Sequence, residues 1–379
     1  MKICFFTTDF PPTLGGISEF SRSIAYHMPE SPRVEHVQVV ALKNQQEGVE
    51  KPNEKLSIIR DDKKSFASLF LKVLRFGIQY SSYDVFHATS VFPIGFLTVL
   101  VGKYLLRKPV FVTFYGTDVL STLGSQKTKW AKVWALKHAT KAIAFSYSTR
   151  DEAARRHNIP LSQFAMVYYP LPDAPKNISS EAVSNTKKQY GITHDDFVVL
   201  YVGHLVKRKG GEYLIRAIRE IPDRHVKLLF VNDGPERENF ERLARDLGVS
   251  SRVIFAGKVP DVSPFYGVAD VFSMPSFFYK EEGDIEGLGI VYLEAQQYGV
   301  PVLGTYSGGI PEAIDENKSG FLVPEKDHQA IAEKIMLLKN DSALRKKIGE
   351  HGKKFVFEKF NWRKSIEGHL DLYKIVWYK

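Results

Sequence analysis

The chain has 379 residues, and at roughly 150 residues per domain this length predicts two to three domains, of which two is our working expectation. Hydrophobic residues make up 44% and charged residues 25%, a composition that excludes an intrinsically disordered chain. The single cysteine, Cys4, excludes an internal disulfide and a cysteine-based zinc site, and favours a reducing compartment, the cytoplasm.

The positive charge lies entirely in the first half of the chain. Residues 1–180 contain 23 basic and 14 acidic side chains, an excess of nine, whereas the remainder has 29 of each. Such a basic half predicts an anionic partner: nucleic acid, an anionic membrane surface or a phosphorylated substrate. We expect no nucleic-acid partner, because no aromatic RNA-binding strand or other recognition motif accompanies the basic residues.

The first half alternates short apolar runs with amphipathic stretches, beginning with an apolar run too short for a signal peptide. The stretch Phe86–Gly102 lacks charged residues but falls short of the ~20 residues that a membrane-spanning helix needs. Strands are predicted at Ile3–Thr8, Val37–Leu42, Val85–Ala88, Pro109–Phe114, Ala142–Phe145 and Ala165–Val167.

The loop Asp9–Gly16, with the sequence DFPPTLGG, follows the first predicted strand and leads into a helix. Backbone amides of Gly15 and Gly16 at a helix start suit a phosphate or a sugar hydroxyl. The loop lacks the spacing of a dinucleotide or P-loop motif, and a simple tight turn is the alternative.

A basic aromatic segment follows at residues 124–137, with the sequence GSQKTKWAKVWALK. At helical spacing it predicts either an interfacial helix on anionic lipid or a core helix with snorkelling lysines. The candidate membrane residues are Lys127, Lys129, Trp130, Lys132 and Trp134.

The segment Tyr169–Asn177 carries three prolines and no periodicity, so the domain linker is expected there. The alternation then restarts, which predicts βαβ units, parallel sheets and two doubly wound Rossmann-like α/β domains. Strands are predicted at Phe197–Val202, Val226–Val231, Arg252–Ala256, Val271–Met274, Pro301–Leu303 and Phe321–Val323, with helices at Glu212–Glu220, Arg237–Leu247 and Ile290–Tyr298 between them.

Two further loops carry candidate chemistry. Gly203–Gly210, GHLVKRKG, gathers Lys207, Arg208 and Lys209 at a strand end, where cations can neutralise a departing diphosphate; a solvated turn is the alternative. Glu286–Glu294, EGLGIVYLE, predicts a helix start near Gly289 whose free amides face an anion, with a carboxylate at each end for hydroxyl groups. Two ordinary exposed glutamates are the alternative.

The segment Met274–Glu312, with PSFFYKEEGDIEGLGIVYLEAQQYGVPV and SGGIPE, resembles the signature of retaining GT-B glycosyltransferases of family 4, including the phosphatidylinositol mannosyltransferases. The agreement extends over nearly the whole chain in the same order. It includes DFPPTLGG, the GHLVKRKGG turn, YGTD at Tyr115–Asp118 and FNW at Phe360–Trp362.

The resemblance implies an acceptor-binding domain at 1–175, a nucleotide-sugar-binding domain at 176–360 and a C-terminal helix, 361–379, that packs back on the first domain. It assigns Glu286 to hydroxyls of the donor sugar, Glu294 to the ribose, and Lys209 to the leaving phosphate. The remaining donor-binding candidates are Gly15, Gly16, Gly203, His204, Gly287, Leu288, Gly289, Ile290 and Val291.

Two positions depart from the family pattern. Tyr115 begins the segment that ends at Asp118, at a position where the family commonly has a histidine. Tyr115 and Asp118 are both catalytic candidates. His204 replaces an arginine, and we expect Arg208 to supply the lost charge, since His204 is fully charged only well below pH ~6.5.

The resemblance implies same-face attack in which the departing phosphate oxygen helps to take the acceptor proton. The chain has no Asp-x-Asp motif, so we expect no metal and no other cofactor. GDP-mannose is the favoured donor, followed by UDP-hexoses, and the expected acceptor is a lipid-linked or polysaccharide intermediate at the inner face of the cell membrane. Alternatives are a nucleotide-sugar epimerase, a phosphorylase and a non-catalytic nucleotide-sugar-binding protein.

Overall fold

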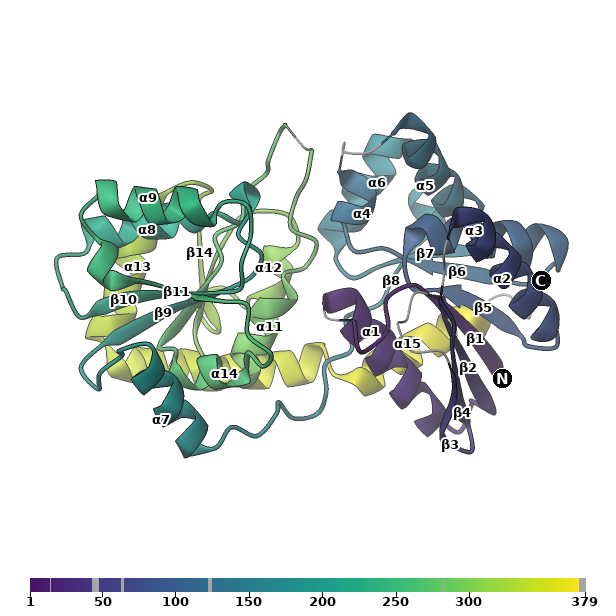
Figure 1. Ribbon diagram of the computed structural model, residues 1–379, viewed down its shortest axis with the longest axis horizontal. Coiled ribbons are helices and arrows are strands. Elements are labelled where there is room, and N and C mark those ends of the chain that lie inside the picture. The colour runs from purple at the N-terminus through teal and green to yellow at the C-terminus, as the bar shows by residue number, and fades with distance from the viewer. Residues whose placement is uncertain (14, 43–47, 63–64, 122–124, 282, 375–379) are drawn as a thin grey trace. The chain divides into compact units, whose positions relative to one another are not determined.

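The computed structural model describes the chain except for residues 14, 43–47, 63–64, 122–124, 282 and 375–379. The chain forms two compact units (Figure 1). Unit 1 comprises Met1–Asp173 and Lys359–Lys379, and unit 2 comprises Ala174–Glu358. The boundary after Asp173 lies inside the proline-rich segment in which the sequence predicts the linker.

Unit 1 is built on an eight-stranded sheet with the order β3-β4-β2-β1-β5-β6-β7-β8. The central strands are buried on both faces, which is why they read in the sequence as continuous apolar runs. Their bounds are β1 Lys2–Thr7, β2 His36–Ala41, β3 Gly48–Asn53, β4 Leu56–Arg60, β5 Val85–Ala88, β6 Val110–Thr113, β7 Lys141–Ala144 and β8 Phe164–Met166.

The expectation of a wholly parallel sheet is wrong at one edge of unit 1. Strand β3 pairs with β4 in the antiparallel direction, and neither strand is predicted from the sequence. The β3 sequence GVEKPN is exposed at every position and contains a proline. An edge strand needs no apolar run and tolerates proline, so hydrogen bonding to β4 produces this strand without a hydrophobic pattern.

Helices flank the unit 1 sheet, and serines cap several of them: the Ser65 and Ser125 side chains accept hydrogen bonds from backbone N–H groups of the first turns of α2 and α5. Their bounds are α1 Gly16–His27, α2 Phe66–Gln79, α3 Phe96–Thr98, α4 Thr117–Leu120, α5 Gln126–His138, α6 Tyr147–His157 and α15 Trp362–Lys374, with π-helical turns η2 Val91–Gly95 and η3 Val99–Leu105 beside α3. Short 3₁₀ turns are η1 Met28–Glu30 and η4 Leu161–Gln163.

Helix α15 packs against the sheet of unit 1 through a buried aromatic and histidine cluster. The Tyr373 hydroxyl lies 2.5 Å from Nδ1 of His87 on β5, whose Nε2 lies 2.8 Å from the Thr113 hydroxyl on β6. His369 is also fully buried, with Nδ1 2.8 Å from the Ser365 carbonyl oxygen. The sequence predicts a helix to Tyr378; the described part ends at Lys374, and residues 375–379 lie outside it.

Unit 2 has a six-stranded sheet with the order β11-β10-β9-β12-β13-β14, in which every strand pair is parallel. Helices lie on both faces of this sheet, as the doubly wound prediction requires (Figure 1). The strands are β9 Phe197–Val202, β10 Val226–Val231, β11 Val253–Gly257, β12 Val271–Ser273, β13 Val302–Thr305 and β14 Gly320–Val323.

The helices of unit 2 follow the strands in alternation, so the loops after β9, β12 and β13 emerge at one sheet edge. Their bounds are α7 Ser180–Gln189, α8 Gly211–Glu220, α9 Arg237–Asp246, α10 Ser263–Val268, α11 Ile290–Gln297, α12 Ile310–Ala313, α13 His328–Asn340 and α14 Ser342–Lys359, with 3₁₀ turns η5 Lys207–Lys209 and η6 Ser250–Arg252. This edge of the sheet holds the candidate site.

Candidate active site

The basic turn η5 lies directly against the loop that follows β12. Gly210, which ends η5, has φ +71°, and a Cβ there would come within 2.0 Å of the Pro275 carbonyl oxygen. Only glycine permits this close approach of the two loops. The Phe277 amide, two residues beyond Pro275, donates a 2.9 Å hydrogen bond to the Arg208 carbonyl oxygen.

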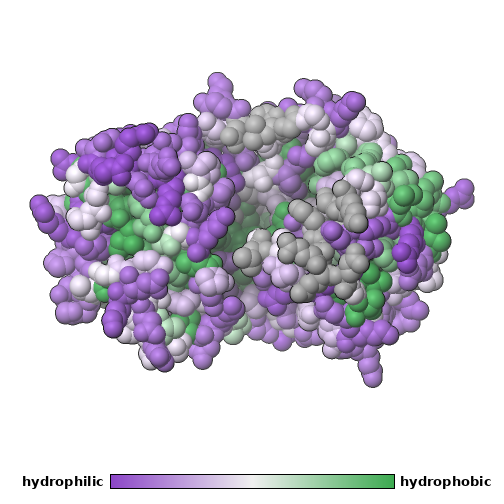
Figure 2. Space-filling view, in the orientation of Figure 1, coloured by the Kyte–Doolittle hydropathy of each residue, from purple (hydrophilic) through white to green (hydrophobic). Residues whose placement is uncertain are grey.

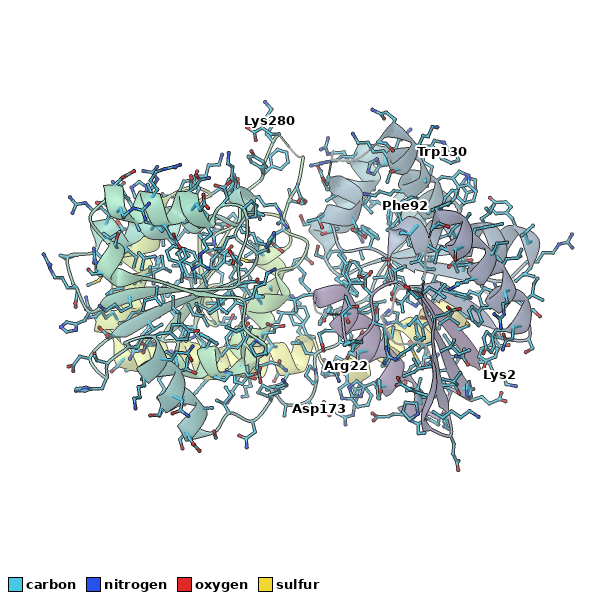
Figure 3. The ribbon with its side chains drawn as sticks, viewed as in Figure 1. Lys2, Arg22, Phe92, Trp130, Asp173 and Lys280 are labelled. Atoms are coloured by element: carbon cyan, nitrogen blue, oxygen red, sulfur yellow. The ribbon has the colours of Figure 1, made fainter. Side chains whose placement is uncertain are left out.

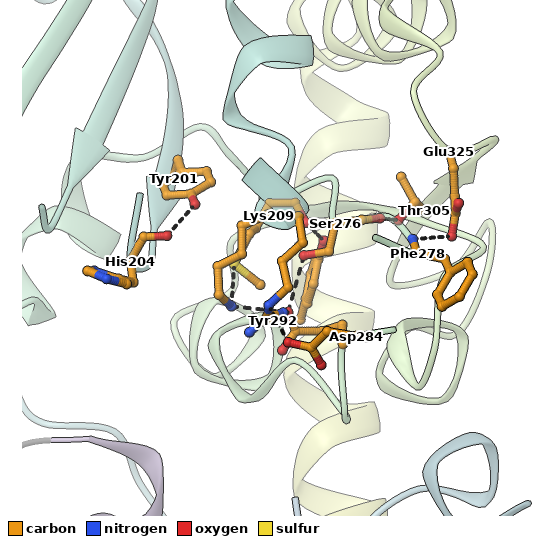
Figure 4. A network of polar contacts seen from close by, with 12 residues as sticks. Tyr201, His204, Lys209, Ser276, Phe278, Asp284, Tyr292, Thr305 and Glu325 are labelled. Carbon is orange, nitrogen blue, oxygen red and sulfur yellow. Dashed lines mark hydrogen bonds and ion pairs between the residues drawn. The ribbon is translucent and has the colours of Figure 1, made fainter. Parts of the chain in front are cut away.

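A compact ionic cluster joins these two loops (Figure 4). The Glu286 carboxylate atom Oε2 lies 3.0 Å from Nζ of Lys209 and 3.2 Å from Nη1 of Arg208, and accepts a hydrogen bond of 3.2 Å from the Ser276 hydroxyl. Nε of Arg208 lies 3.0 Å from Oδ2 of Asp284. The cluster therefore balances two cations against two carboxylates inside the protein.

Burial decides how this cluster behaves. The four charged side chains expose between 6% and 15% of their area, so their charges are poorly screened by solvent. Burial alone raises the pKa of Glu286, but the charges of Lys209 and Arg208 and two hydrogen bonds outweigh it and lower the pKa to about 2. Burial also lowers the pKa of Lys209, with Glu286 opposing that shift. The cluster is a fixed, ionised arrangement.

A cavity of about 340 Å³ opens beside the cluster. It is lined by the loops after β9 and β10 together with Tyr279: His204, Val206, Lys207, Arg208, Lys209, Pro235, Glu236 and Tyr279. His204 is exposed and its Nδ1 lies 2.6 Å from the Asp233 carbonyl oxygen. The cavity wall thus carries three consecutive cations, which suits a ligand with several negative charges.

Helix α11 begins at the other side of Glu286. Its cap, Gly289, has φ +75°, and a Cβ there would come within 2.7 Å of the Tyr292 ring. Amides of the first turn of an α-helix have no partner within the helix and carry partial positive charge. The preceding residues Gly287 and Leu288 are buried, whereas Ile290 and Val291 at the helix start are half-buried. On the next turn, Oε2 of Glu294 accepts a 2.7 Å hydrogen bond from the Tyr266 hydroxyl.

Gly308 holds the backbone of Glu286 in place, and this gives a testable prediction. With φ +54°, Gly308 lies so close that a Cβ would stand 2.1 Å from the Glu286 carbonyl oxygen, which also accepts a 3.0 Å hydrogen bond from the Gly309 amide. Gly308→Ala is expected to displace Glu286, weaken nucleotide binding at least tenfold, and lower the thermal midpoint. Calorimetric titration with nucleoside diphosphates measures the effect.

The matched control for that substitution is Gly248→Ala. Gly248 has φ +68°, but a Cβ at this position would meet no atom within 4 Å, so alanine adds only the backbone strain of about 1 kcal/mol. Unchanged nucleotide affinity in Gly248→Ala, with lost affinity in Gly308→Ala, assigns the effect to the contact with Glu286. Equal losses would contradict it.

The remaining candidates lie in unit 1. The Tyr115 hydroxyl donates a 2.8 Å hydrogen bond to the Thr89 carbonyl oxygen, and its ring packs edge-on against Phe20. Oδ1 of Asp118 accepts hydrogen bonds from the amides of Tyr115 and Gly116 at 2.9 and 3.0 Å. Burial raises the pKa of Asp118 to about 6, against the lowering effect of those amides and of Lys132.

The glycines of the first loop are only partly informative. Gly15 caps α1 with φ +134° and Gly16 begins the helix; both are exposed. Leu14, in the same DFPPTLGG loop, lies outside the described residues. The two amides are therefore at a helix start, as the sequence predicts, and the structure adds no ligand contact to them.

Among the sequence-predicted residues, the structure brings Arg208, Lys209 and Glu286 into direct contact, with Gly203 against the Met274 and Lys209 side chains. Asp284 and Ser276 were missed as site residues. Both lie in the quoted segment, but neither has a spacing that marks it, because their role depends on Arg208 and Glu286 arriving from other loops. In the described ranges, no group of three or more histidine, cysteine or acidic side chains is arranged to hold a metal ion.

Helix α5 is partly buried, and its membrane contact remains a prediction. Ala131, Ala135 and Leu136 are buried, whereas Trp130 is 60% exposed. Trp134 is half-buried, with its ring 5.2 Å from that of Phe96. The helix therefore packs through its small and apolar residues and leaves Trp130, Lys127 and Lys137 exposed. None of the helices in the described chain combines the length and apolar character needed to cross a membrane.

Comparisons with known proteins agree with this division of the chain. A family model described as "Glycosyltransferase Family 4" matches residues 15–171, and one described as "Glycosyl transferases group 1" matches residues 183–355. An uncharacterised glycosyltransferase of Methanocaldococcus jannaschii is 30% identical over 306 residues, which cover 77% of this chain and 75% of that protein.

A second relative and a solved structure are also similar. A GDP-mannose-dependent alpha-(1-6)-phosphatidylinositol monomannoside mannosyltransferase of Mycolicibacterium smegmatis is 35% identical over 218 residues, covering 53% of this chain and 56% of that protein. The crystal structure of Anabaena HepE in complex with UDP superposes with a TM-score of 0.79 at 19% identity, over 98% of this chain and 99% of that one. Another crystal structure of HepE contains UDP-glucose.

Proposed function

Because this chain belongs to the group 1 glycosyltransferases and has the GT-B fold, as its motifs predict, we propose that it transfers a hexose from a nucleoside diphosphate sugar to a hydroxyl group with retention of configuration. The observation that carries the proposal is the buried contact of Glu286 with Lys209 and Arg208. It sets a hydrogen-bond acceptor for sugar hydroxyls beside cations for a diphosphate.

In the proposed reaction, the bond between the anomeric carbon and the phosphate oxygen breaks, and a bond from that carbon to the acceptor oxygen forms on the same face. The acceptor proton passes to the departing phosphate. Lys209 and Arg208 stabilise the negative charge that develops on that phosphate, together with the first-turn amides of α11. Asp284 holds Arg208 in orientation through its 3.0 Å contact with Nε.

We propose GDP-mannose as the donor, with UDP-hexoses as the next candidates. The GDP-mannose-dependent relative supports the first choice, and the nucleotides bound to HepE support the second. Glu294, held by Tyr266, is proposed to bind the ribose hydroxyls. The acceptor is proposed to be a lipid-linked or polysaccharide intermediate.

A thermal-shift panel of GDP, UDP, ADP and CMP tests the donor. A ligand at a hundred times its dissociation constant stabilises by ~2.7 kcal/mol, which raises the midpoint by roughly 5–10 °C for a unit of this size. If the nucleotides of a single base raise the midpoint and the others do not, that base identifies the donor class. Glu294→Ala is expected to reduce the shift with that nucleoside diphosphate and to leave the shift with inorganic pyrophosphate unchanged, since pyrophosphate has no ribose.

The proposed reaction needs no metal, because side-chain cations and helix amides face the diphosphate. We predict that EDTA leaves the initial rate unchanged, and that added Mg²⁺ or Mn²⁺ after chelation does not raise it. The measurement is nucleotide release in the presence of acceptor, with a metal-dependent glycosyltransferase as the control for effective chelation. A strict metal requirement would contradict this prediction.

A non-catalytic nucleotide-sugar-binding protein is the second candidate, because Tyr115 and His204 depart from the family pattern. Binding of a nucleotide sugar without nucleotide release, on any acceptor tested, favours this candidate. An epimerase would alter the sugar with no acceptor present. Product analysis by mass spectrometry, with and without acceptor, distinguishes these reactions.

We further propose that the enzyme works in the cytoplasm and associates peripherally with the inner face of the membrane through α5. Its exposed tryptophan and basic side chains are the support for this proposal. Sedimentation with vesicles that contain anionic lipid is the test, with zwitterionic vesicles and high salt as controls. Absence of binding to anionic vesicles at low salt overturns it.

A further inference from the structure

An aromatic groove in unit 1 joins the first turns of α5, part of the basic aromatic segment, to Phe66, Phe92 and Phe96, which none of the motifs includes. It has a volume of about 520 Å³ and is formed by the start of α2, the turn η2, α3 and the first two turns of α5. Its lining includes Phe66, Phe92, Phe96, Lys127, Trp130 and Ala131. Figure 2 shows hydrophobic surface, in green, gathered over this side of unit 1, and Figure 3 marks Phe92 and Trp130 there.

The rings form an ordered wall with large exposed faces. Phe66 and Phe92 are stacked with centroids 6.1 Å apart, and Phe96 meets Trp130 edge-on at 6.2 Å. Phe66 is nevertheless 51% exposed and Trp130 60% exposed. Exposed aromatic surface of this kind around a concave site marks a place where apolar material binds.

The charge beside the groove is positive. Helix α5 carries Lys127, Lys129, Lys132 and Lys137 and has no acidic residue. Lys127 itself lines the groove. An apolar hollow with a cationic rim is complementary to a molecule that joins a hydrocarbon chain to an anionic group.

The same helix connects the groove to the candidate residues of unit 1. Lys132 directly follows the lining residue Ala131, and its charge helps to lower the pKa of Asp118 against the effect of burial. Asp118 in turn organises the Tyr115 turn. Helix α5 thus contributes both to the groove, through Lys127 and Trp130, and to the surroundings of Asp118, through Lys132.

We propose that this groove binds one hydrocarbon chain of an anionic lipid acceptor, with the anionic group beside Lys127. The proposal rests on the proposed transfer to a lipid-linked acceptor and adds the site that selects it. A single hydrocarbon chain is the proposed occupant because the groove combines an apolar aromatic lining with one lysine, Lys127, for one anionic group.

The test is calorimetric titration of the full chain with alkyl phosphates of six to ten carbons, each below its aggregation concentration. Each methylene that enters an apolar site tightens binding about fourfold. We expect this dependence until the groove is filled. An affinity that does not change with chain length, or binding to vesicles with no binding of monomeric alkyl phosphate, overturns the proposal.

Two pairs of variants locate the binding. Phe66→Ser is expected to weaken the binding of decyl phosphate at least tenfold. Leu71→Ser is the control and should leave this affinity unchanged, because Leu71 lies on the same helix, is 61% exposed and does not line the groove. Lys127→Glu is expected to weaken the same binding at least fivefold, and Lys137→Glu, at the far end of α5, less than twofold. Equal effects within either pair also overturn the proposal.

The nucleotide thermal shift separates this inference from the proposed function. If the protein binds GDP or UDP but its affinity for alkyl phosphates does not depend on alkyl length, the proposed transfer stands and the groove proposal fails. If the protein binds alkyl phosphates with the expected length dependence but binds no nucleotide, the groove proposal stands and the proposed transfer fails. Trp130→Ser provides a second groove variant, which is expected to behave as Phe66→Ser does.

Discussion

Lys209→Met is expected to lower kcat by about a hundredfold to a thousandfold, the loss found when one preorganised donor to a developing negative charge is removed. Lys209, like Arg208, is in direct contact with Glu286, and the described contacts engage its ammonium group with Glu286 and Met274 only. One of its three N–H donors is therefore available to a leaving phosphate. Methionine keeps the aliphatic contacts near Gly203 and Met274.

The folded state should tolerate this substitution, because Glu286 keeps its contacts with Arg208 and Ser276. The measurement is kcat for nucleotide release, with the thermal midpoint determined on the same sample. Lys207→Met is the matched control: it removes an exposed cation from the same turn and is expected to change kcat less than fivefold. A Lys209→Met enzyme with nearly normal kcat would exclude Lys209 from leaving-group stabilisation.

His204 is expected to be secondary in the same reaction. Its side chain is exposed and engages the Asp233 backbone, whereas Arg208 is buried between two carboxylates. If His204→Ala abolished turnover and Arg208→Ala did not, the assignment of the charge to Arg208 would be wrong.

The second large effect is a loss of stability in mild acid, caused by two buried histidines, His369 on α15 and His87 on β5. Burial lowers the pKa of His369 to about 4 and holds the pKa of His87 well below its ordinary value. Both histidines are neutral in the folded state, whereas in the unfolded state they take up a proton near pH ~6.5. Their effect on the free energy of unfolding is therefore absent above pH ~6.5, and stability falls as the pH decreases towards 4. At pH 5, His369 alone should cost about 2 kcal/mol of the free energy of unfolding.

His369→Phe isolates this contribution, because it preserves ring volume next to Phe20 and Tyr373 and removes the titrating group. Relative to wild type, the variant is expected to gain roughly 4–8 °C in thermal midpoint at pH 5 compared with pH 7.5. His194→Gln, whose side chain is 91% exposed, serves as the control and should leave the wild-type pH dependence unchanged. Parallel pH profiles for His369→Phe and wild type would refute the argument.

The stability of the variant must be compared with that of wild type at each pH, because carboxylates also titrate in or near this pH range. Asp118, with its pKa raised to about 6, contributes stability as the pH falls, opposite in sign to the histidines. Glu286, with its pKa lowered to about 2, loses its stabilising charge only below pH ~4.5. Measurements between pH 5.0 and 7.5 therefore keep the Glu286 contribution out of the comparison.

Strands of unit 2 show why much of the fold can be predicted. Phe197–Val202 and Val226–Val231 are parallel strands that are buried except at Lys227, and strands buried on both faces have nearly continuous apolar sequences. The same rule fails for Gly48–Asn53, which is an exposed antiparallel edge strand. Its formation depends on hydrogen bonds to Leu56–Arg60, and those bonds leave no hydrophobic periodicity in the sequence.

The candidate site also has residues that the sequence predicts and residues that only the tertiary structure brings together. Glycine-rich turns at strand ends are local features, so the sequence alone indicates Lys209 and the Glu286–Glu294 segment. Asp284 is different, because its role exists only when Arg208 lies 3.0 Å away. The aromatic groove likewise combines Phe66, Phe92 and Trp130 from separate elements.

The sequence by itself determined the α/β class and the loops that carry the candidate chemistry, because burial periodicity and backbone turns are properties of neighbouring residues. The family followed from the resemblance of its motifs. Only the tertiary structure decided which charges meet, which aromatic faces stay exposed and which histidines are buried. Those properties depend on side chains distant in sequence being brought within a few ångströms of each other, where desolvation and electrostatic interaction become strong.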